Sequence, residues 1–186
     1  MRAVHGSALL NSVPVLSPLA RTDFETLAVL AREIWLAHYS TIITTDQIEY
    51  MLRGRFTAAN LERYLDSPER WMHVLRRDGQ AIGYCSYAKT DQPRELKLEQ
   101  LYLLPSLHGQ GLGRVMLDQV EAHAQRLGCD MLMLQVNKQN TVALNVYRRT
   151  GFTLREEIVV DIGNGFVMDD FIMEKKLGMT GRKNVQ

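Results

Sequence analysis

The first third of the chain carries hydrophobic residues at the spacing of helices. A short apolar run at 15–20 precedes them, and Pro18 places that run at the edge of a sheet or at a bulge. Beyond it, one buried helix face repeats every 3.6 residues through Phe24, Leu27, Ala28, Ala31 and Trp35. The segments 22–25 and 44–47 match the capping-box pattern and predict two helix starts. A shorter helix is predicted at 58–65.

From residue 70 onward the pattern shortens to a period of two, which is typical of strands. Residues 70–76 alternate, Asp78 and Gly79 form a predicted hairpin turn, and 80–89 is the return strand. The remaining predicted elements are strands at 97–104, 131–136, 152–162 and 166–175, and helices at 112–127 and 141–149. This order of elements indicates one mixed α/β domain.

The expected boundaries are a loose leader at 1–13, a single domain at 14–177 and a disordered polar tail at 178–186. A chain of 186 residues can bury a full core without disulfides or a structural metal. We therefore expect one folding unit.

Composition and charge exclude several classes of function. The chain has 22 lysine and arginine residues against 21 acidic ones, so its net charge of +1 gives no electrostatic reason to expect nucleic acid or an acidic membrane as partner. No apolar run approaches the ~18 residues of a membrane span, and polar residues interrupt the N-terminal stretch, which makes it a poor signal peptide. Cys85 and Cys129 lack CxxC spacing, so we expect no zinc or other metal site, and reduced thiols in a cytoplasmic protein.

A glycine-rich turn between a predicted strand and a predicted helix is the most informative segment. Gly109, Gly111 and Gly113 alternate at the helix start, where backbone amides and the helix dipole attract an anion, and Arg114 adds a full charge. The dinucleotide pattern GxGxxG fails at Arg114, and the Gly-Lys-Ser/Thr of a nucleotide-triphosphate loop is absent. Nicotinamide dinucleotides and nucleoside triphosphates are therefore disfavoured as ligands. The alternative to an anion site is a tight structural turn, which a single glycine would favour.

The segment from His108 to Gly113 resembles the pyrophosphate loop of GNAT N-acetyltransferases, written Q/R-x-x-G-x-G/A. Gly111 and Gly113 match, and His108 stands where the family has Gln or Arg. Residues 140–152 are similar to the family's N-x-x-A-x-x-x-Y-x-x-x-G-F helix, and the resemblance runs from about residue 15 to residue 177. It implies an α/β fold with a mixed sheet of about seven mostly antiparallel strands, splayed at an acetyl-CoA site, with about four to five helices. Short matches place the chain nearest to small bacterial members related to polyamine (spermidine/spermine) acetyltransferases.

The resemblance implies that acetyl-CoA is the co-substrate. Its pyrophosphate would lie on the turn and helix start, at His108, Gly109, Gln110, Gly111, Leu112, Gly113 and Arg114. The backbone of Leu101 and Leu103 would bind the pantetheine arm like an added strand, with the Leu103 N–H as oxyanion donor. Asn140 would contact the same arm while capping its helix. Tyr147 would donate the proton to the leaving thiolate, or else orient the sulfur. The alternative interpretation is that Tyr147 is a core residue that supports Phe152.

Glu99 is the predicted base, acting through water on the acceptor amine. It lies two residues before Leu101, so the two are expected to share a face of the strand. The alternative is a surface carboxylate paired with Lys97 or Lys89. For the acceptor pocket we expect contributions from His38, Tyr39 and Asp169, with Tyr50 and Asp170 as further members; a structural histidine and a solvated acidic pair are the alternatives.

These expectations predict an acetyl-CoA-dependent N-acetyltransferase that acts on a small primary amine by direct attack in a ternary complex. One alternative acceptor is a protein N-terminus or lysine, and an alternative of another class is a module that senses acetyl-CoA without turnover. Homodimers are common among such relatives, but nothing in this sequence identifies an interface.

Overall fold

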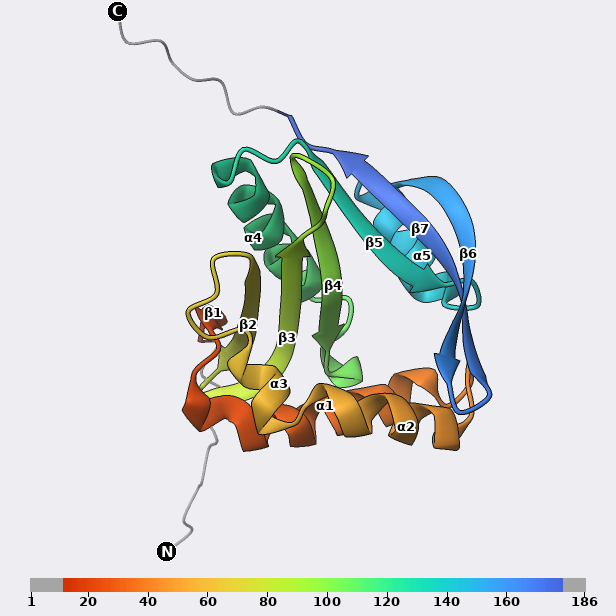
Figure 1. Ribbon diagram of the computed structural model, residues 1–186. Coiled ribbons are helices and arrows are strands. Elements are labelled where there is room, and N and C mark those ends of the chain that lie inside the picture. Colours follow the sequence, from red (N-terminus) through yellow and green to blue (C-terminus); the bar gives the residue numbers. More distant parts are fainter. Residues whose placement is uncertain (1–11, 179–186) are drawn as a thin grey trace, which may run out of the picture.

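The computed structural model describes residues 12–178 (Figure 1). The expected leader and tail lie outside these residues except at positions 12, 13 and 178. Every described strand joins a single sheet of seven strands in the order β1-β2-β3-β4-β5-β7-β6. The strands are β1 (Val15–Pro18), β2 (Arg70–Arg77), β3 (Gln80–Lys89), β4 (Glu95–Leu103), β5 (Met131–Asn137), β6 (Thr153–Gly163) and β7 (Phe166–Lys176). Only β4 and β5 pair in parallel, so the predicted mixed, mostly antiparallel sheet is confirmed.

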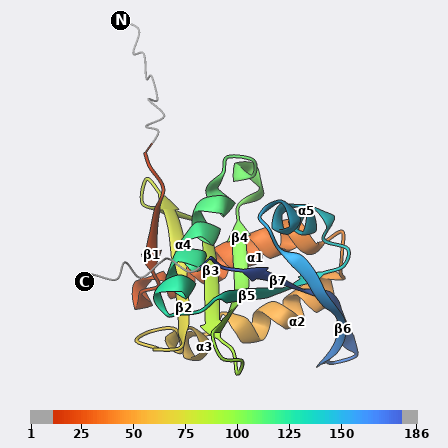
Figure 2. The same cartoon turned by 90° about the horizontal axis from the view of Figure 1, so that it is seen from above.

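Helices cover both faces of the sheet (Figures 1 and 2). One face carries α1 (Phe24–Tyr39), α2 (Thr45–Arg55) and α3 (Ala58–Glu62), and the other carries α4 (Leu112–Arg126) and α5 (Thr141–Arg149). Two short 3-10 turns, Arg21–Asp23 and Pro105–Leu107, precede α1 and α4. Two hydrophobic cores result, one on each face, because successive side chains of a strand point to opposite sides. Tyr84 of β3 is buried under α1, whereas Cys85 and Tyr87 belong to the α4 core.

Turn chemistry fixes the two predicted hairpins. Asp78 and Gly79 have φ values of +52° and +77°, as the two-residue turn between β2 and β3 requires. Gly163, Asn164 and Gly165 are all left-handed in the β6–β7 turn. Both hairpins are therefore formed where the sequence predicts them.

The predicted capping box at 22–25 is wrong. The 3-10 turn Arg21–Asp23 precedes α1, and Asp23 is the N-cap residue. One Asp23 oxygen accepts a hydrogen bond from the Ala20 amide (2.9 Å) and the other pairs with Arg76 of β2. The Asp23 side chain therefore makes no hydrogen bond to the amides of α1, and one of its partners lies on a strand that is distant in sequence, which a local pattern does not contain.

The capping box at 44–47 is half formed. Thr44 Oγ1 accepts from the Gln47 amide (3.2 Å), but Gln47 Nε2 donates to the Val167 carbonyl (2.9 Å) instead of returning to the cap. Gln47 therefore ties α2 to β7. The helix predicted at 58–65 ends earlier, at Glu62.

Candidate active site

The site lies where β4 and β5 part. Their parallel pairing runs only from Glu95–Met131 to Leu98–Leu134, after which both strands continue unpaired with each other. The Leu104 amide bonds to Ile82 of β3 (3.0 Å), so the Leu103 amide, one residue earlier, points to the opposite edge, into the split. The splay thus leaves polar backbone groups of β4 facing a gap.

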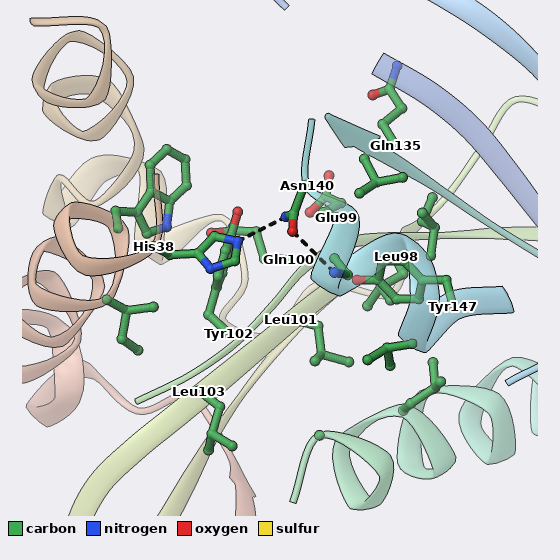
Figure 3. Close-up of a pocket in the computed structure, with 18 of the residues that line it drawn as sticks. His38, Leu98, Glu99, Gln100, Leu101, Tyr102, Leu103, Gln135, Asn140 and Tyr147 are labelled. Carbon is green, nitrogen blue, oxygen red and sulfur yellow. Dashed lines mark hydrogen bonds between the residues drawn. The ribbon is translucent and has the colours of Figure 1, made fainter. Parts of the chain in front are cut away.

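A cavity of about 730 Å³ fills this gap, within the usual range for small-molecule sites. It is bounded by the unpaired part of β4, the starts of α4 and α5, and the C-terminal half of α1 with α2 and α3. Figure 3 shows His38, Glu99, Leu101, Asn140 and Tyr147 around it. The structure therefore brings both predicted motifs and the early helices to one place.

The glycine turn forms one wall. Gly109 and Gly111 both have φ of +78°, and Gly111 is the N-cap residue of α4. The backbone amides of Leu112 and Gly113 therefore lie in the first turn, where a helix has no partner of its own for them. Gly113 faces β4, where an added Cβ would lie 3.9 Å from Leu101 Cδ2, an ordinary van der Waals distance. Of the predicted phosphate-binding positions, His108, Gly109, Gly111, Leu112, Gly113 and Arg114 line the cavity.

Two members of the turn have other partners. Gln110 does not line the cavity; its Oε1 accepts from Nη1 and Nη2 of Arg77 (3.3 and 3.4 Å). Arg114 lines the cavity, and its Nε pairs with Asp118 (2.7 Å). His108 Nε2 lies 3.2 Å from the Leu103 carbonyl, and since a carbonyl only accepts, the histidine is the donor. His108 therefore holds the turn against β4.

Asn140 joins the two sides of the cavity. Its Oδ1 accepts from the Ala143 amide (3.1 Å), as the predicted cap requires. Its Nδ2 lies 2.9 Å from His38 Nε2 on α1 (Figure 3). Because the Asn140 oxygen serves the cap, the amide nitrogen donates, and His38 Nε2 carries no proton. Burial lowers the pKa of His38, and so does the nearby His108, which agrees with a neutral ring.

Tyr147 lies on the same side of α5 as Asn140, as predicted from their spacing. Its ring packs edge-on against Phe152, with centroids 5.5 Å apart, and it borders the cavity. No described residue hydrogen-bonds its hydroxyl. Burial raises the pKa of Tyr147, so the phenol keeps its proton.

Glu99 does not share a face with Leu101, contrary to the sequence expectation. Ser86 of β3 pairs with Gln100 and the next residue, Tyr87, pairs with Leu98, so Glu99 is the extra residue of a β-bulge. Leu101 packs into the α4 core, whereas Glu99 turns toward α3. The predicted partners Lys97 and Lys89 are also wrong. Glu99 accepts from the Tyr64 hydroxyl (3.0 Å) and pairs with Arg70 (3.3 Å).

The acidic pair of β7 is divided between solvent and cavity. Asp169, the predicted substrate residue, is 54% exposed and pairs with Lys138 (2.6 Å), so its placement in the pocket is wrong. Asp170 is buried and lines the cavity, and burial together with the Asp169 charge raises its pKa. The alternation of a strand explains why one of two neighbours faces in. Tyr50 also lies elsewhere and donates to the Ile162 carbonyl (2.8 Å).

Several cavity residues had no signal in the sequence. Tyr39 was predicted, but its partner Tyr102 was not: their hydroxyls lie 2.9 Å apart, and burial raises the pKa of Tyr39 to about 12. The other unpredicted lining residues include Arg55, Arg63, Tyr64, Arg70, Gln100 and Gln135. They reach the cavity only because α2 and α3 pack beside β4, which is a tertiary arrangement.

No group of three or more His, Cys, Asp or Glu side chains within residues 12–178 is placed to hold a metal ion. None of the helices formed by these residues is long and apolar enough to cross a membrane.

Comparisons with known proteins agree with this geometry. A model of the acetyltransferase (GNAT) family matches residues 30–152, which contain the glycine turn and the α5 motif. A spermidine N(1)-acetyltransferase of Thermoplasma acidophilum is 28% identical over 162 residues, covering 85% of this chain and 94% of that protein. An uncharacterized N-acetyltransferase of Mycobacterium tuberculosis is 28% identical over 156 residues, covering 84% of this chain and 99% of that protein.

A solved structure has the same architecture. The PaiA N-acetyltransferase from Thermoplasma acidophilum, in complex with coenzyme A, matches with a TM-score of 0.77 and 25% identity. The match covers 89% of this chain and 99% of that chain.

Proposed function

Because this chain belongs to the acetyltransferase (GNAT) family, it is an acetyl-CoA-dependent N-acetyltransferase, and we propose that its acceptor is the primary amine of a small molecule. The observation that carries the proposal is the cavity at the β4–β5 split, which borders both the glycine turn and the early helices. A relative named as a spermidine N(1)-acetyltransferase supports a small amine as the class of acceptor.

The residues around the split fit acetyl-CoA. The amides at the start of α4 suit the pyrophosphate, because a helix N-terminus binds anions and left-handed Gly109 and Gly111 bring backbone close to it. The outward amides of Leu101 and Leu103 suit the pantetheine arm, since they point into the split where β5 no longer pairs. The Leu103 amide is the proposed oxyanion donor, and His108 steadies it by bonding the carbonyl of the same residue.

Asn140 is proposed as a further contact to the pantetheine arm. Its side chain already serves the cap and His38, so the arm would meet an amide that two hydrogen bonds hold in one orientation. The same side chain thereby places α5, and with it Tyr147, opposite the early helices.

Transfer then needs four events. The acceptor nitrogen, once neutral, forms a bond to the acetyl carbon, the C–S bond breaks, the nitrogen releases its second proton as the amide forms, and the sulfur takes a proton. Tyr147 is the proposed donor of that proton, or the group that orients the sulfur, because its hydroxyl is protonated and has no other described partner. The amine is mostly cationic at neutral pH and must first lose a proton.

Glu99 is the proposed acceptor of that proton, through a water molecule. Tyr64 and Arg70 hold its carboxylate in place, and each carboxylate oxygen can accept a further hydrogen bond. The proposed acid and base therefore approach the reacting carbonyl from opposite faces of the sheet.

The experiment measures the release of CoA from acetyl-CoA in the presence of each small amine of a panel, and it identifies the acetylated product by mass spectrometry. Acetylation of a small amine is the expected result. Acetylation of peptide N-termini or lysines alone would replace the small-molecule acceptor with a protein acceptor. Binding of acetyl-CoA without transfer to either class would indicate a sensor module instead.

A further inference from the structure

The half of the cavity that faces the early helices α1, α2 and α3, called the acceptor half below, is basic. The charged side chains that line it, on β2, β4, β7, α2 and the segment after α3, are Arg55, Arg63, Arg70, Lys97, Glu99 and Asp170. Four of these are cations and two are acids. The whole chain is nearly neutral, so this excess is local to the cavity.

Three of the four cations lack a carboxylate partner. Arg70 pairs with Glu99 (3.3 Å), and Lys97 Nζ donates to Gln135 Oε1 (2.7 Å). Arg55 and Arg63 form no ion pair with any residue in the described range 12–178. Arg55 lies over the Trp35 ring, 5.6 Å from its centroid, which fixes its charge at the cavity wall.

The charge of Arg55 acts across the cavity. Burial lowers the pKa of Lys97, and the positive charge of Arg55 lowers it further, whereas Glu99 and Asp170 raise it. Arg55 and Lys97 therefore share one space and repel each other. An anion bound between them would relieve that repulsion.

The same wall offers acceptors for an amine. Gln100 Oε1 and Asp170 Oδ1 are both buried and have no hydrogen-bond partner among the described residues. Both residues line the cavity, and Gln100 directly follows the bulge at Glu99. Unpaired buried acceptors favour a ligand with N–H donors.

We propose that the acceptor is a primary amine that also carries an oxyanion, a carboxylate or a phosphate, which Arg55 and Arg63 bind. This inference rests on the proposed small-amine function and specifies its substrate. The planar guanidinium fork matches either oxyanion with two parallel hydrogen bonds. A polyamine is the opposite case, because its additional ammonium groups would meet the unpaired arginines.

The test uses the full chain and matched substrates. Each ω-amino carboxylate of a length series is compared with the n-alkylamine of the same carbon count, because the two amines have similar basicity and shape. O-phosphoethanolamine against ethanolamine forms the phosphate arm, and spermidine the polyamine arm. We expect kcat/KM to favour one of the two anionic classes by at least about tenfold, the worth of one charge-assisted hydrogen bond. The preference should fall with added salt, since the arginines are exposed.

Variants attribute the preference to the arginines. In Arg55→Gln and Arg63→Gln we expect the anionic-to-neutral ratio of kcat/KM to fall several-fold, mainly through KM for the anionic amine. Arg53→Gln is the matched control, because Arg53 lies on the same helix and does not line the cavity. Its ratio should match that of the unaltered protein, and acetyl-CoA affinity verifies that each variant is folded.

Three outcomes would overturn the inference. If neutral amines or spermidine are acetylated better than every anionic partner, the substrate class is wrong while the small-amine function stands. If the anionic preference survives in both cavity arginine variants, the assignment of the oxyanion to Arg55 and Arg63 is wrong. If acetyl-CoA binds and no small amine of any charge is acetylated, the proposed function itself fails, and the inference with it.

Discussion

Replacing Tyr147 with phenylalanine removes one hydroxyl from the cavity and keeps the ring that packs against Phe152. No described residue loses a hydrogen bond, so the free energy of unfolding should change by less than about 0.5 kcal/mol. The hydroxyl matters when the C–S bond breaks, because the sulfur carries negative charge only then. A full proton-donor role predicts a fall in kcat of ~10²–10⁴-fold, equivalent to about 3–5 kcal/mol in the barrier, if bond cleavage limits the rate.

The assay measures kcat with a known acceptor and the acetyl-CoA dissociation constant by calorimetry. Affinity should be almost unchanged, since a transition-state interaction appears in kcat and not in ground-state binding. Because burial raises the pKa of Tyr147, the phenol stays protonated, so the loss should have the same size at neutral and mildly alkaline pH.

Tyr50→Phe is the matched control. It also removes one phenol hydroxyl, but Tyr50 lies outside the cavity and donates to the Ile162 carbonyl. It should cost about 1 kcal/mol in stability and leave kcat intact. A fall of only a few-fold in Tyr147→Phe would reduce its role to orienting the sulfur, and full activity in a folded variant would refute the reasoning.

Three further predictions concern the base, the glycine turn and a buried histidine. Glu99→Gln should lower activity most at neutral pH and less at alkaline pH, where the amine is already neutral; an equal loss in a full pH profile would contradict proton removal. Gly111→Val should weaken acetyl-CoA binding measured by calorimetry more than Gly128→Val, which places the same residue at the same φ of +78° at the far end of α4; equal affinities would speak against the turn as the phosphate site. Burial lowers the pKa of His73 to about 4, below the 6.5 of the unfolded chain, so the unfolded chain takes up the proton first and stability falls by about 3 kcal/mol as pH drops from 6.5 to 4. Urea unfolding at several pH values should show this slope reduced in His73→Phe, and an unchanged slope would assign it to other groups.

Local patterns predicted the elements that local chemistry decides. The Asp78–Gly79 turn requires left-handed backbone, and the Asn140 cap requires a short acceptor at a helix start, so both could be predicted from the residues alone. The start of α1 could not be predicted in detail, because the Asp23 carboxylate pairs with Arg76 instead of capping the helix. That partner lies on β2, and a window of neighbouring residues carries no trace of it.

The candidate site divides in the same way. The glycine turn and the α5 motif are contiguous, so their residues were identifiable together. The acceptor half is assembled from the early helices and from strands β2, β4 and β7, and its arginines look like ordinary surface residues in the sequence. Asp169 and Asp170 were equivalent as a pair, and only the register of β7 against β5 decides which one is buried.

The bulge at Glu99 shows why alternation along β4 misled and what the irregularity achieves. A regular strand would place Glu99 with Leu101 and Leu103, on the face that packs against α4. One extra residue reverses the phase, so Leu98 and Leu101 both stay in the α4 core while Glu99, Gln100 and Tyr102 face the early helices. The same strand can then present backbone amides to acetyl-CoA at its edge and polar side chains to the acceptor on its face.

Tyr147 reaches the split from the α5 side and Glu99 from the α3 side, so the proposed acid and base do not compete for one position. Deleting Glu99 would restore regular pairing, with Leu98 and Gln100 opposite Tyr87 and Ser86, and it would remove the carboxylate from the acceptor face without changing the phase of Gln100. We therefore regard the bulge as the feature of β4 on which the proposed chemistry depends.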